Sequence, residues 1–478
     1  MKSESSASNE LVWDRRARFA LWLMEHTKEP VFITGRAGTG KSTLLQYFRK
    51  STAKRIAILA PTGLAAINVN GQTIHSFFRL PSRMITDDAI KRIWGNQVIR
   101  KIDTLVIDEV SMVRADLMDG IHKALQINRK NDLLFGGVQV VFFGDLFQLP
   151  PVVSRAEESL MQAHYSSPYF FSAKVFQEVK PIQIELTTVH RQKEEAFLEL
   201  LNQVREDRLS EWGLGRLNER VIIKKPPDDY LVLTTVNDKA RRINEERLKS
   251  LGGPPFTYVA HTDGDFNERD FPTESELTLK VGARVMFLRN DPDGLFVNGT
   301  LGTVEYLHGE IIRIETDDGD QVEVSPEKWE NMRYYFDAEE NKIVSETVGT
   351  FTQYPLKLAY AITIHKSQGQ TFDKVAIDLD RGAFTHGQTY VALSRCRTFE
   401  GILLTRPIRS SDVLFDPIVY EATHAFQPGN QIYQDYLERF KEAKNQLLQG
   451  NSAYLVSNRL RLPLATVQKM ASELPTSI

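Results

Sequence analysis

The chain has 478 residues, too many for one ordinary hydrophobic core, so two or more domains are expected. Hydrophobic residues make up 42% and charged residues 25%, as in globular proteins, and no apolar run reaches the roughly 18 residues needed to cross a bilayer. The single cysteine excludes an intramolecular disulfide and a Cys-rich zinc site, and a net charge of −3 means that any polyanion must be bound by a local groove.

The N-terminal region begins with a polar segment, 1–8, and an amphipathic helix is expected over 11–26. The region lacks the positive, apolar and small-residue order of a signal peptide, which favours a cytoplasmic, nucleoid-associated location. Residues 31–34 predict a short buried strand, and 43–50 predict a helix.

Further apolar runs predict buried strands along most of the chain, and they cover 56–60, 104–108, 138–143, 231–235, 375–379 and 401–405. Continuous apolar strands separated by helical stretches indicate parallel sheets covered on both faces, which is an α/β fold. Between 252 and 346 the pattern becomes all-β, with hairpin signals at Asn298-Gly299 and Asp318-Gly319. This change predicts a small barrel inserted into a second α/β domain.

These patterns predict the domain boundaries. The first α/β domain covers 1–175 and includes a surface loop within 72–95; the second covers 176–251 and 347–405, the barrel insert 252–346, and a helical extension 406–478.

The extension ends in helices expected over 455–461 and 464–474, joined by a short turn. With Arg459, Arg461 and Lys469 beside it, this region resembles part of a helix-turn-helix. A small helical cap on the second domain fits the same residues equally well.

Gly35 to Ser42 matches the phosphate-binding pattern G-x-x-x-x-G-K-S between a predicted strand and a predicted helix. Glycines allow backbone N–H groups to wrap phosphates closely, and the N-terminus of the following helix attracts negative charge. Lys41 is expected to reach the β- and γ-phosphates of ATP, and Ser42 to ligate Mg²⁺. The predicted nucleotide-binding residues of this loop are Gly35, Gly38, Thr39, Gly40, Lys41, Ser42 and Thr43.

The predicted strand over 104–108 leads into two adjacent acids. Asp108 is expected to hold Mg²⁺ with Ser42, and Glu109 to orient or deprotonate the attacking water. Successive strand side chains point in opposite directions, so both acids can serve only where the strand ends and the backbone bends. Gln148, in the loop after 138–143, is a candidate sensor of the γ-phosphate, with a solvated loop glutamine as the alternative.

Two arginines, Arg191 and Arg395, are candidates for reaching the phosphates from the second domain. A guanidinium stabilises charge on a transferring phosphoryl group, and its placement on another domain makes hydrolysis depend on closure. A lone arginine is normally a surface residue, so this role depends on the wider set of motifs.

That set occurs in a specific order: GRAGTGKS (35–42), APTGLAA (60–66), GQTIHSFF (71–78), VIDEVSM (106–112), GDLFQLPPV (144–152), TTVHRQ (187–192), KLAYAITIHKSQGQTF (357–372) and YVALSRCRT (390–398). It resembles the Pif family of DNA helicases, in the 5′-to-3′ branch of superfamily 1 with the RecD-like enzymes. The segment 114–129 resembles the family's signature between the acidic and glutamine motifs.

The resemblance implies two RecA-like domains with ATP and Mg²⁺ in the cleft, an SH3-like barrel inserted in the second, and single-stranded DNA running across both. It implies an ATP-dependent DNA helicase that moves 5′ to 3′ and unwinds duplexes, forks or G-quadruplexes. We expect it to bind junctions of single- and double-stranded DNA and to be monomeric when free. The implied ATPase residues are Lys41, Asp108, Glu109, Gln148, Arg191 and Arg395, with Gly369 in the loop beside them.

The DNA-facing motifs of the family fall on Pro61, Thr62, Gly63, His75, Phe77, Phe78, His365, Lys366 and Ser367. A motor indifferent to base sequence must hold phosphates and stack bases, and these hydroxyls, backbone N–H groups and rings suit both tasks. Core packing is an equally good interpretation of Phe77 and Phe78. The loop within 72–95 is a candidate wedge for strand separation.

Family members usually place an adenine-reading glutamine upstream of the phosphate loop, but the first glutamine here is Gln46, so a strict preference for ATP is less strongly predicted. Two other functions fit the residues. One is a motor that acts on RNA–DNA hybrids or within a recombination nuclease. The other is a nucleotide-gated switch that binds single-stranded DNA, and Glu109 argues against it because a switch needs no water-activating acid.

Overall fold

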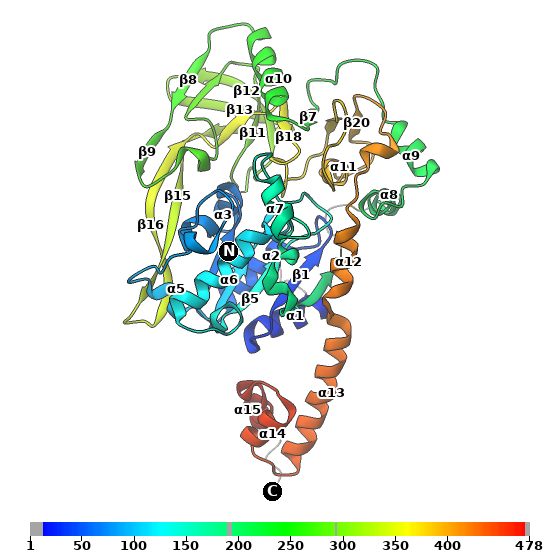
Figure 1. Ribbon diagram of the computed structural model, residues 1–478. Coiled ribbons are helices and arrows are strands. Elements are labelled where there is room, and N and C mark those ends of the chain that lie inside the picture. Colours follow the sequence, from blue (N-terminus) through cyan, green and yellow to red (C-terminus); the bar gives the residue numbers. More distant parts are fainter. Residues whose placement is uncertain (1–12, 189–193, 292–293, 474–478) are drawn as a thin grey trace, which may run out of the picture.

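The computed structural model describes residues 13–188, 194–291 and 294–473. A first α/β lobe lies at the centre, with a second α/β lobe and a β-structured insert above it (Figure 1). A long helix carries the C-terminal end away from the first lobe. None of the described helices combines the length and the apolar character needed to cross a membrane.

Seven parallel strands form the sheet of the first lobe, in the order β21-β6-β1-β5-β4-β2-β3. Alternating side chains of β1 enter different cores, because Phe32 lies in one cluster and Val31 and Ile33 lie in another. Both faces are therefore covered, as the continuous apolar runs predict. The strands are β1 Val31–Gly35, β2 Ile56–Ala60, β3 Gln72–Thr73, β4 Thr104–Ile107, β5 Gln139–Phe143, β6 Ile182–Leu186 and β21 Gln427–Pro428.

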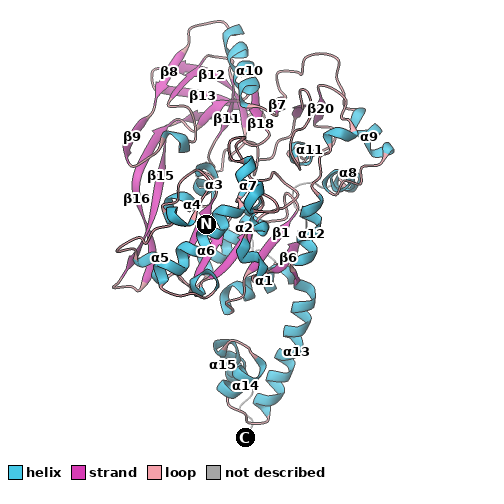
Figure 2. Cartoon of the chain, viewed as in Figure 1, coloured by secondary structure: helices cyan, strands magenta, loops and turns pink. Residues whose placement is uncertain are grey.

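Helices pack on the two faces of this sheet, as Figure 2 shows in outline. Residues of α1 and α2 belong to one core, and residues of α4, α5 and α6 to the other. The Asp14 side chain begins α1 by accepting a hydrogen bond from the Ala17 N–H at 2.8 Å. The helices are α1 Arg15–His26, α2 Lys41–Ser51, α3 Gly63–Asn68, α4 Ile74–Phe78, α5 Gln97–Lys101, α6 Ala115–Arg129 and α7 Glu158–His164.

The segment 72–95 differs from the predicted surface loop. It contains β3 and α4, and four of its later apolar side chains are buried in the first-lobe core: Leu80, Ile85, Ile90 and Ile93. The burial of these four side chains could not be predicted, because single apolar residues between polar ones give no periodic signal. Its assignment as a wedge stays a prediction.

Four parallel strands form the sheet of the second lobe, in the order β18-β7-β19-β20. The strands are β7 Leu231–Thr234, β18 Ala361–Thr363, β19 Val375–Asp378 and β20 Ile402–Leu404. The accompanying helices are α8 Glu195–Arg205, α9 Glu211–Asn218, α10 Asn237–Ser250 and α11 Gln388–Leu393. The α/β class with two parallel sheets is confirmed.

Antiparallel strands between β7 and β18 form the insert. A five-stranded sheet, β14-β13-β12-β11-β17, adjoins a three-stranded sheet, β15-β16-β9, and a pair, β10-β8. The Asp318-Gly319 signal lies in the β13–β14 turn, where Gly319 has a φ of 91°. The strands are β8 Phe256–Val259, β9 His261–Gly264, β10 Glu276–Leu279, β11 Arg284–Phe287, β12 Leu301–His308, β13 Ile311–Thr316, β14 Gln321–Val324, β15 Glu327–Asp337, β16 Lys342–Gln353 and β17 Leu356–Leu358.

The long β15–β16 hairpin of the insert reaches the first lobe. The Tyr334 hydroxyl accepts a hydrogen bond from the Ile58 N–H at 3.2 Å and lies 3.4 Å from the Ile58 carbonyl oxygen. Phe336 and Ile343 pack against the first-lobe core. The insert therefore belongs to the second lobe by chain order and also contacts the first.

The C-terminal extension returns to the first lobe. After α12 (Pro417–Ala425), β21 adds a parallel strand beside β6, and α13 (Gly429–Leu448) packs on β6. Trp22 of α1 meets Tyr436 and Phe440 of α13 edge to face, at ring-centroid distances of 4.9 and 5.1 Å. Helices α14 (Ala453–Leu460) and α15 (Leu464–Glu473) follow. A cap on the second lobe, one of the two interpretations of this tail, is wrong, because α13 packs on the first lobe and α14 and α15 pack on the far end of α13.

Candidate functional site

The phosphate loop joins β1 to α2 in the conformation that its glycines allow. Gly35 has a φ of 151°, and a Cβ at this position would lie 2.6 Å from the Leu186 carbonyl oxygen and from Thr39 Oγ1. Gly38 and Gly40 have φ values of 81° and 85°. The helix α2 begins directly afterwards, so its first-turn N–H groups face this loop.

Lys41 lies at the start of α2 and is held by the loop. Its Nζ donates to the Gly35 carbonyl oxygen at 2.6 Å and to the Arg36 carbonyl oxygen at 3.1 Å. Burial lowers the pKa of Lys41, and the negative charges of Asp145, Glu109 and Asp108 oppose that shift. Ser42 and Thr43 follow in the first turn with exposed side chains.

Two carboxylates follow the end of β4, where the backbone turns sharply. Glu109 has φ 47° and ψ 44°, a left-handed conformation uncommon for a residue with a side chain. Burial raises the pKa of both Asp108 and Glu109, and the charge of Glu109 raises the pKa of Asp108 further. The predicted bend thus occurs and leaves both acids within electrostatic reach of Lys41.

The loop after β5 carries a buried acid beside Gln148. Asp145 is 1% exposed, and its Oδ2 accepts a hydrogen bond from Gln148 Nε2 at 3.3 Å. Gln148 is itself buried, so the solvated-loop alternative is wrong. Burial raises the pKa of the Asp145 carboxyl, but the positive charges of Arg205 and Lys41 outweigh this and hold the pKa below its ordinary value.

The partner of Asp145 is Arg205, which comes from α8 of the second lobe. Arg205 Nη2 lies 3.2 Å from Asp145 Oδ1, and its guanidinium carbon lies 3.8 Å from the centroid of the Phe147 ring. The side chain is 5% exposed. A buried ion pair thus connects the two lobes beside the phosphate loop.

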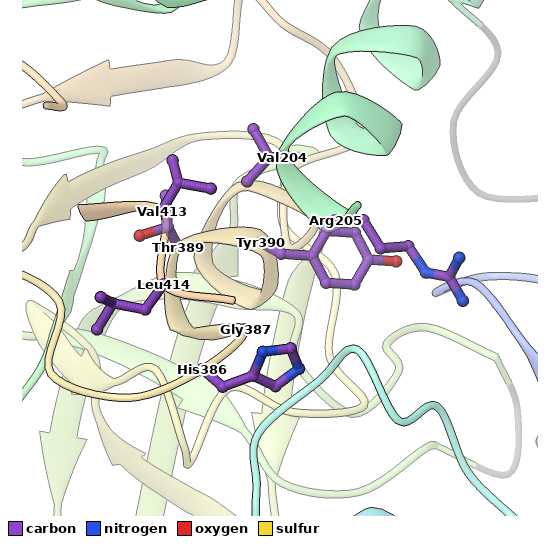
Figure 3. A pocket seen from close by; sticks show the side chains of 8 residues that line it. All are labelled: Val204, Arg205, His386, Gly387, Thr389, Tyr390, Val413 and Leu414. Carbon is purple, nitrogen blue, oxygen red and sulfur yellow. The ribbon is translucent and has the colours of Figure 1, made fainter. Parts of the chain in front are cut away.

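Further contacts join the lobes around this pair, and Figure 3 shows the side chains of Arg205, Tyr390 and His386 that take part. The Tyr390 hydroxyl on α11 accepts a hydrogen bond from the Ala37 N–H of the phosphate loop at 3.4 Å. His386 Nε2 lies 3.1 Å from the Leu146 carbonyl oxygen, while its Nδ1 accepts from the Asp416 N–H at 3.0 Å. Because Nδ1 accepts, Nε2 carries the proton and donates to Leu146. A small cleft is lined by Val204, Arg205, His386, Gly387, Thr389, Tyr390, Val413 and Leu414.

Sequence reasoning missed Arg205, although a signal for it exists. In α8 the buried residues Phe197, Leu201 and Val204 follow a helical spacing, and Arg205 lies eight positions after Phe197 on the same face. A charged residue on an apolar helix face must meet an opposite charge when it is buried. Such a position therefore predicts a distant carboxylate partner without identifying it.

Arg395 lies at the end of α11 and is 1% exposed. Its Nε donates to the Val391 carbonyl oxygen at 3.0 Å, and Nη1 donates to the carbonyl oxygens of Ser367 and Gln370 at 3.4 and 3.3 Å. Burial lowers the pKa of Arg395, and the charges of Tyr390 and Glu109 oppose the shift. The guanidinium is therefore directed into the protein, within electrostatic reach of Glu109 and Asp145. Arg191, the other arginine candidate, lies outside the described residues.

The first predicted DNA-facing motif begins α3. The Thr62 side chain caps the helix by accepting from the Ala65 N–H at 3.2 Å, and Thr62 is exposed while Pro61 and Gly63 are half-buried. The Asp270 carboxylate, from a short 3₁₀ turn of the insert (Glu268–Asp270), occupies the space that a side chain at Gly63 would fill. An acid of the insert thus lies where a DNA phosphate is predicted.

The second DNA-facing motif is largely covered. Phe77 and Phe78 are 5% and 2% exposed and meet edge to face at 4.8 Å, so core packing is the correct description of both in this structure. Phe77 also meets Tyr334 of the β15–β16 hairpin, with ring centroids 6.1 Å apart. His75 is half-buried, and burial lowers its pKa. The insert therefore covers the Phe77 side of this motif.

The third DNA-facing motif follows β18. His365 is half-buried and Lys366 is exposed. Ser367 is fully buried, and its Oγ donates to the Ile364 carbonyl oxygen at 2.8 Å, so the prediction that its hydroxyl faces DNA is wrong for this structure. Its carbonyl oxygen instead accepts from Arg395. Gly369 is exposed with a φ of 78°. This motif thus connects the predicted DNA surface directly to Arg395.

Upstream of the phosphate loop, where a glutamine is missing, Trp13 meets Tyr47 of α2 edge to face at 5.3 Å. Asp14 is occupied, because it caps α1 and its Oδ2 accepts from the Thr188 hydroxyl at 3.3 Å. The described residues of this region therefore offer two aromatic rings and no amide side chain toward a base.

Comparison with known proteins shows which family has a sequence similar to this chain. The profile of the PIF1-like helicase family matches residues 20–214, and that of the DNA helicase Pif1 2B domain matches 268–307. The ATP-dependent DNA helicase Pif1 of Psychrobacter sp. is 32% identical over 87% of this chain and 73% of that protein. The protein of the same name from Bdellovibrio bacteriovorus is 34% identical over 79% of this chain and 84% of its own length.

Solved structures of Bacteroides sp. Pif1 resemble the chain to different degrees. The unliganded protein and its complex with ADP-AlF4 both have a TM-score of 0.81, at 36% identity over 87% of this chain and 97% of theirs. The complex with single-stranded DNA has a TM-score of 0.64 at 37% identity over the same shares. The chain therefore resembles the unliganded and ADP-AlF4-bound structures more closely than the complex with single-stranded DNA.

The ion pair between Arg205 and Asp145 can be tested by a double-mutant cycle. Arg205→Met should lower the melting temperature, because a buried carboxylate left without its partner costs about 3–5 kcal/mol. Adding Asp145→Asn should recover part of the loss, with a coupling of about 1–3 kcal/mol. Thermal unfolding of the four proteins measures both effects.

The control for this cycle is Arg242→Met, since Arg242 is exposed on α10. Its melting temperature should match that of the parent. Additive losses for Arg205→Met and Asp145→Asn would show that the two side chains do not interact.

Proposed function

This chain belongs to the PIF1-like helicase family and is an ATP-dependent DNA helicase; on this basis we propose that it translocates 5′ to 3′ along single-stranded DNA and unwinds duplexes, forks and G-quadruplexes. Its substrates are single-stranded DNA and junctions with duplex DNA. The observation that supports the motor most is the buried contact between the lobes at Asp145 and Arg205, since it lies beside Lys41.

We propose that the phosphate loop and the two acids perform hydrolysis. Loop N–H groups and the Lys41 ammonium hold the β- and γ-phosphates, which requires Lys41 to leave the carbonyl oxygens of Gly35 and Arg36. Ser42 and Asp108 are suited to holding Mg²⁺, which neutralises phosphate charge when bound. Glu109, whose pKa is raised by burial, orients the attacking water and accepts its proton. Gln148 reports on the γ-phosphate through Asp145.

Arg395 is proposed to couple hydrolysis to DNA. Its guanidinium bonds to Ser367 and Gln370 in the motif that carries His365 and Lys366, so a shift of that motif on DNA alters the position of the guanidinium. A guanidinium directed at the γ-phosphate stabilises charge in the transition state. DNA binding and hydrolysis are then linked through one short chain of contacts. We also propose that Arg191 reaches the phosphates from the second domain, as the sequence predicts.

We propose that DNA displaces the insert from the first lobe. In this structure Asp270 lies against Gly63, and the β15–β16 hairpin covers Phe77 through Tyr334. Gly63 and Phe77, the two residues that the insert covers, lie on predicted DNA-facing motifs together with Pro61, Thr62 and His75. Removal of the hairpin would uncover the Phe77 ring for stacking against a base. The lower similarity to the DNA complex of the Bacteroides relative supports such a rearrangement.

The remaining proposals concern organisation in the cell. We propose a monomer when free, and a cytoplasmic, nucleoid-associated location that is supported by the action of the family on DNA. The proposed domains keep the order of the sequence prediction, which is 1–175, then 176–251 with 347–405, then 252–346 and 406–478, but β6 pairs with β1, so the first domain extends past residue 175.

Direction is tested with forked or partial duplexes that carry only a 5′ or only a 3′ single-stranded tail. Strand separation should require ATP and the 5′ tail, because the motor must load on single strands and move toward the 3′ end. Gel or fluorescence assays measure it, with Lys41→Ala as the inactive control. Separation of 3′-tailed substrates alone would contradict the proposed polarity.

Arg395→Ala should reduce DNA-stimulated ATP turnover by about 10³-fold, as expected for removal of an arginine that acts on the transition state. Nucleotide affinity, measured with a fluorescent ATP analogue, should change by less than about tenfold. Arg397→Ala is the matched control, since Arg397 lies two residues away, is exposed and pairs with Asp373 at 2.7 Å. Full turnover by the Arg395 variant would remove the coupling role.

Asp270→Asn should strengthen binding of single-stranded DNA, because the acid no longer competes with phosphates for the Thr62–Gly63 region. An increase of about fivefold is expected, equivalent to ~1 kcal/mol. Fluorescence anisotropy with a labelled oligonucleotide measures it. Asp263→Asn, an exposed acid on β9 of the same insert, should leave the affinity unchanged. Weaker binding by the Asp270 variant would refute the competition.

A further inference from the structure

The last three helices form a compact unit that the ATPase site does not use. The C-terminal half of α13 packs with α14, and α14 with α15. Their shared core contains Ala443 of α13, Val456 of α14 and Val467 of α15, all fully buried, with Leu462 of the turn. Three helices around one core are the framework of helix-turn-helix variants such as the homeodomain, in which the last helix enters the major groove.

The turn between α14 and α15 has the short length of a helix-turn-helix and is closed by hydrogen bonds. It consists of Arg461, Leu462 and Pro463, and Arg461 has a φ of 51° at the end of α14. Ser457 closes the turn, because its carbonyl oxygen accepts from the Leu462 N–H at 3.1 Å and its Oγ donates to the Leu462 carbonyl oxygen at 2.7 Å. The turn is therefore held by specific bonds, and α15 leaves it in a defined direction.

One face of α15 is exposed along its length. Its residues follow the spacing i, i+1, i+4, i+5 and i+8, which places them on one side of a helix, and they are Leu464, Ala465, Gln468, Lys469 and Ser472. An exposed glutamine near the middle of such a face can donate to and accept from a base edge in the major groove. The opposite face, with Val467, closes the core.

The charge of this unit differs from that of the whole chain. Over α14, the turn and α15 (453–473) the basic residues are Arg459, Arg461 and Lys469 and the one acid is Glu473, which gives a net charge of +2, although the chain has a net charge of −3. Arg459 and Arg461 are both exposed, at the end of α14 and in the turn. A local positive surface in an acidic protein suits a polyanion.

The unit is also attached rigidly to the motor. The Trp22, Tyr436 and Phe440 rings join α1 to α13, and the Arg15 guanidinium lies 4.0 Å from the centroid of the Tyr433 ring. A helix of the length of α13 extends about 30 Å, and Figure 1 shows α14 and α15 at its far end. A ligand on α15 would therefore be attached through α13 to the first lobe.

From this geometry, we propose that α13, α14 and α15 form a helix-turn-helix that binds double-stranded DNA, with α15 in the major groove and Arg459 and Arg461 on the flanking phosphates. This site is separate from the single-strand path and rests only on the action of the chain on DNA. It would anchor the duplex arm of a junction to the first lobe while the lobes work on the single strand.

The test measures binding of the full chain to a short blunt duplex without single-stranded tails, by fluorescence anisotropy over a series of salt concentrations. The double variant Arg459→Gln/Arg461→Gly removes two charges, and glycine tolerates the left-handed φ of the turn. Duplex affinity should fall by at least about tenfold, and the salt slope by about two, since each phosphate contact contributes about 0.9. A second variant, Gln468→Glu, places an acid in the exposed face and should also weaken duplex binding.

Three controls decide the outcome. Melting temperatures of both variants should match the parent, Arg242→Gln should bind duplex normally, and ATP turnover stimulated by single-stranded DNA should stay within about twofold. Unchanged duplex affinity in both variants would overturn the proposal and leave the face to a protein partner. Loss of single-strand stimulation together with duplex binding would also overturn it, because the arginines would then serve the motor. The requirement for a 5′ tail in unwinding is measured in a separate experiment. Failure of the duplex-binding proposal can therefore be distinguished from failure of the proposed function.

Discussion

One buried ion pair constrains the whole structure, because it can form only when the two lobes are in contact. Arg205 arrives on α8 of the second lobe and Asp145 on the loop after β5 of the first, and both are almost completely removed from water. Each charge alone would cost several kcal/mol to bury, so the two must be buried together. The pair lies within electrostatic reach of Lys41, so a change of charge at the phosphate loop alters the free energy of lobe contact. This is the physical requirement for nucleotide-driven motion between discrete states.

The chain crosses between the lobes more than once, and this limits how they can move. The β15–β16 hairpin leaves the second lobe to contact Ile58, while β21 and α13 follow the second lobe in sequence but complete the sheet and one face of the first. The insert contact places Tyr334, Phe336 and Ile343 at the edge of the first-lobe core and adjoins predicted DNA-facing motifs. The α13 contact is an aromatic cluster continuous with a core. The contact of the β15–β16 hairpin is therefore suited to opening, and the contact of α13 to permanent attachment.

The sequence predicted the parallel sheets, the phosphate loop and the pair of acids well, since each depends on neighbouring residues. The bend at Glu109 was predicted from the alternation of strand side chains, and the structure has it. Phe77, Phe78 and Ser367, which the resemblance places on DNA-facing motifs, are buried in this structure for a common reason. A motif that borders DNA in a family contains both contact residues and the residues that support them, and which is which depends on distant residues such as Tyr334, which packs on Phe77, and Arg395, which bonds to Ser367.

The sequence by itself determined the local chemistry: which loop can wrap a phosphate, which strand ends in carboxylates and which segments alternate as helix or strand, because those properties arise within a few residues of backbone. Only the tertiary structure decided which residues from distant parts of the chain contact one another in the interior and between the lobes. Arg205 and Asp145, Tyr390 and Ala37, and Asp270 and Gly63 are pairs far apart in the chain. Their meeting depends on how whole lobes pack, and no local pattern carries that information.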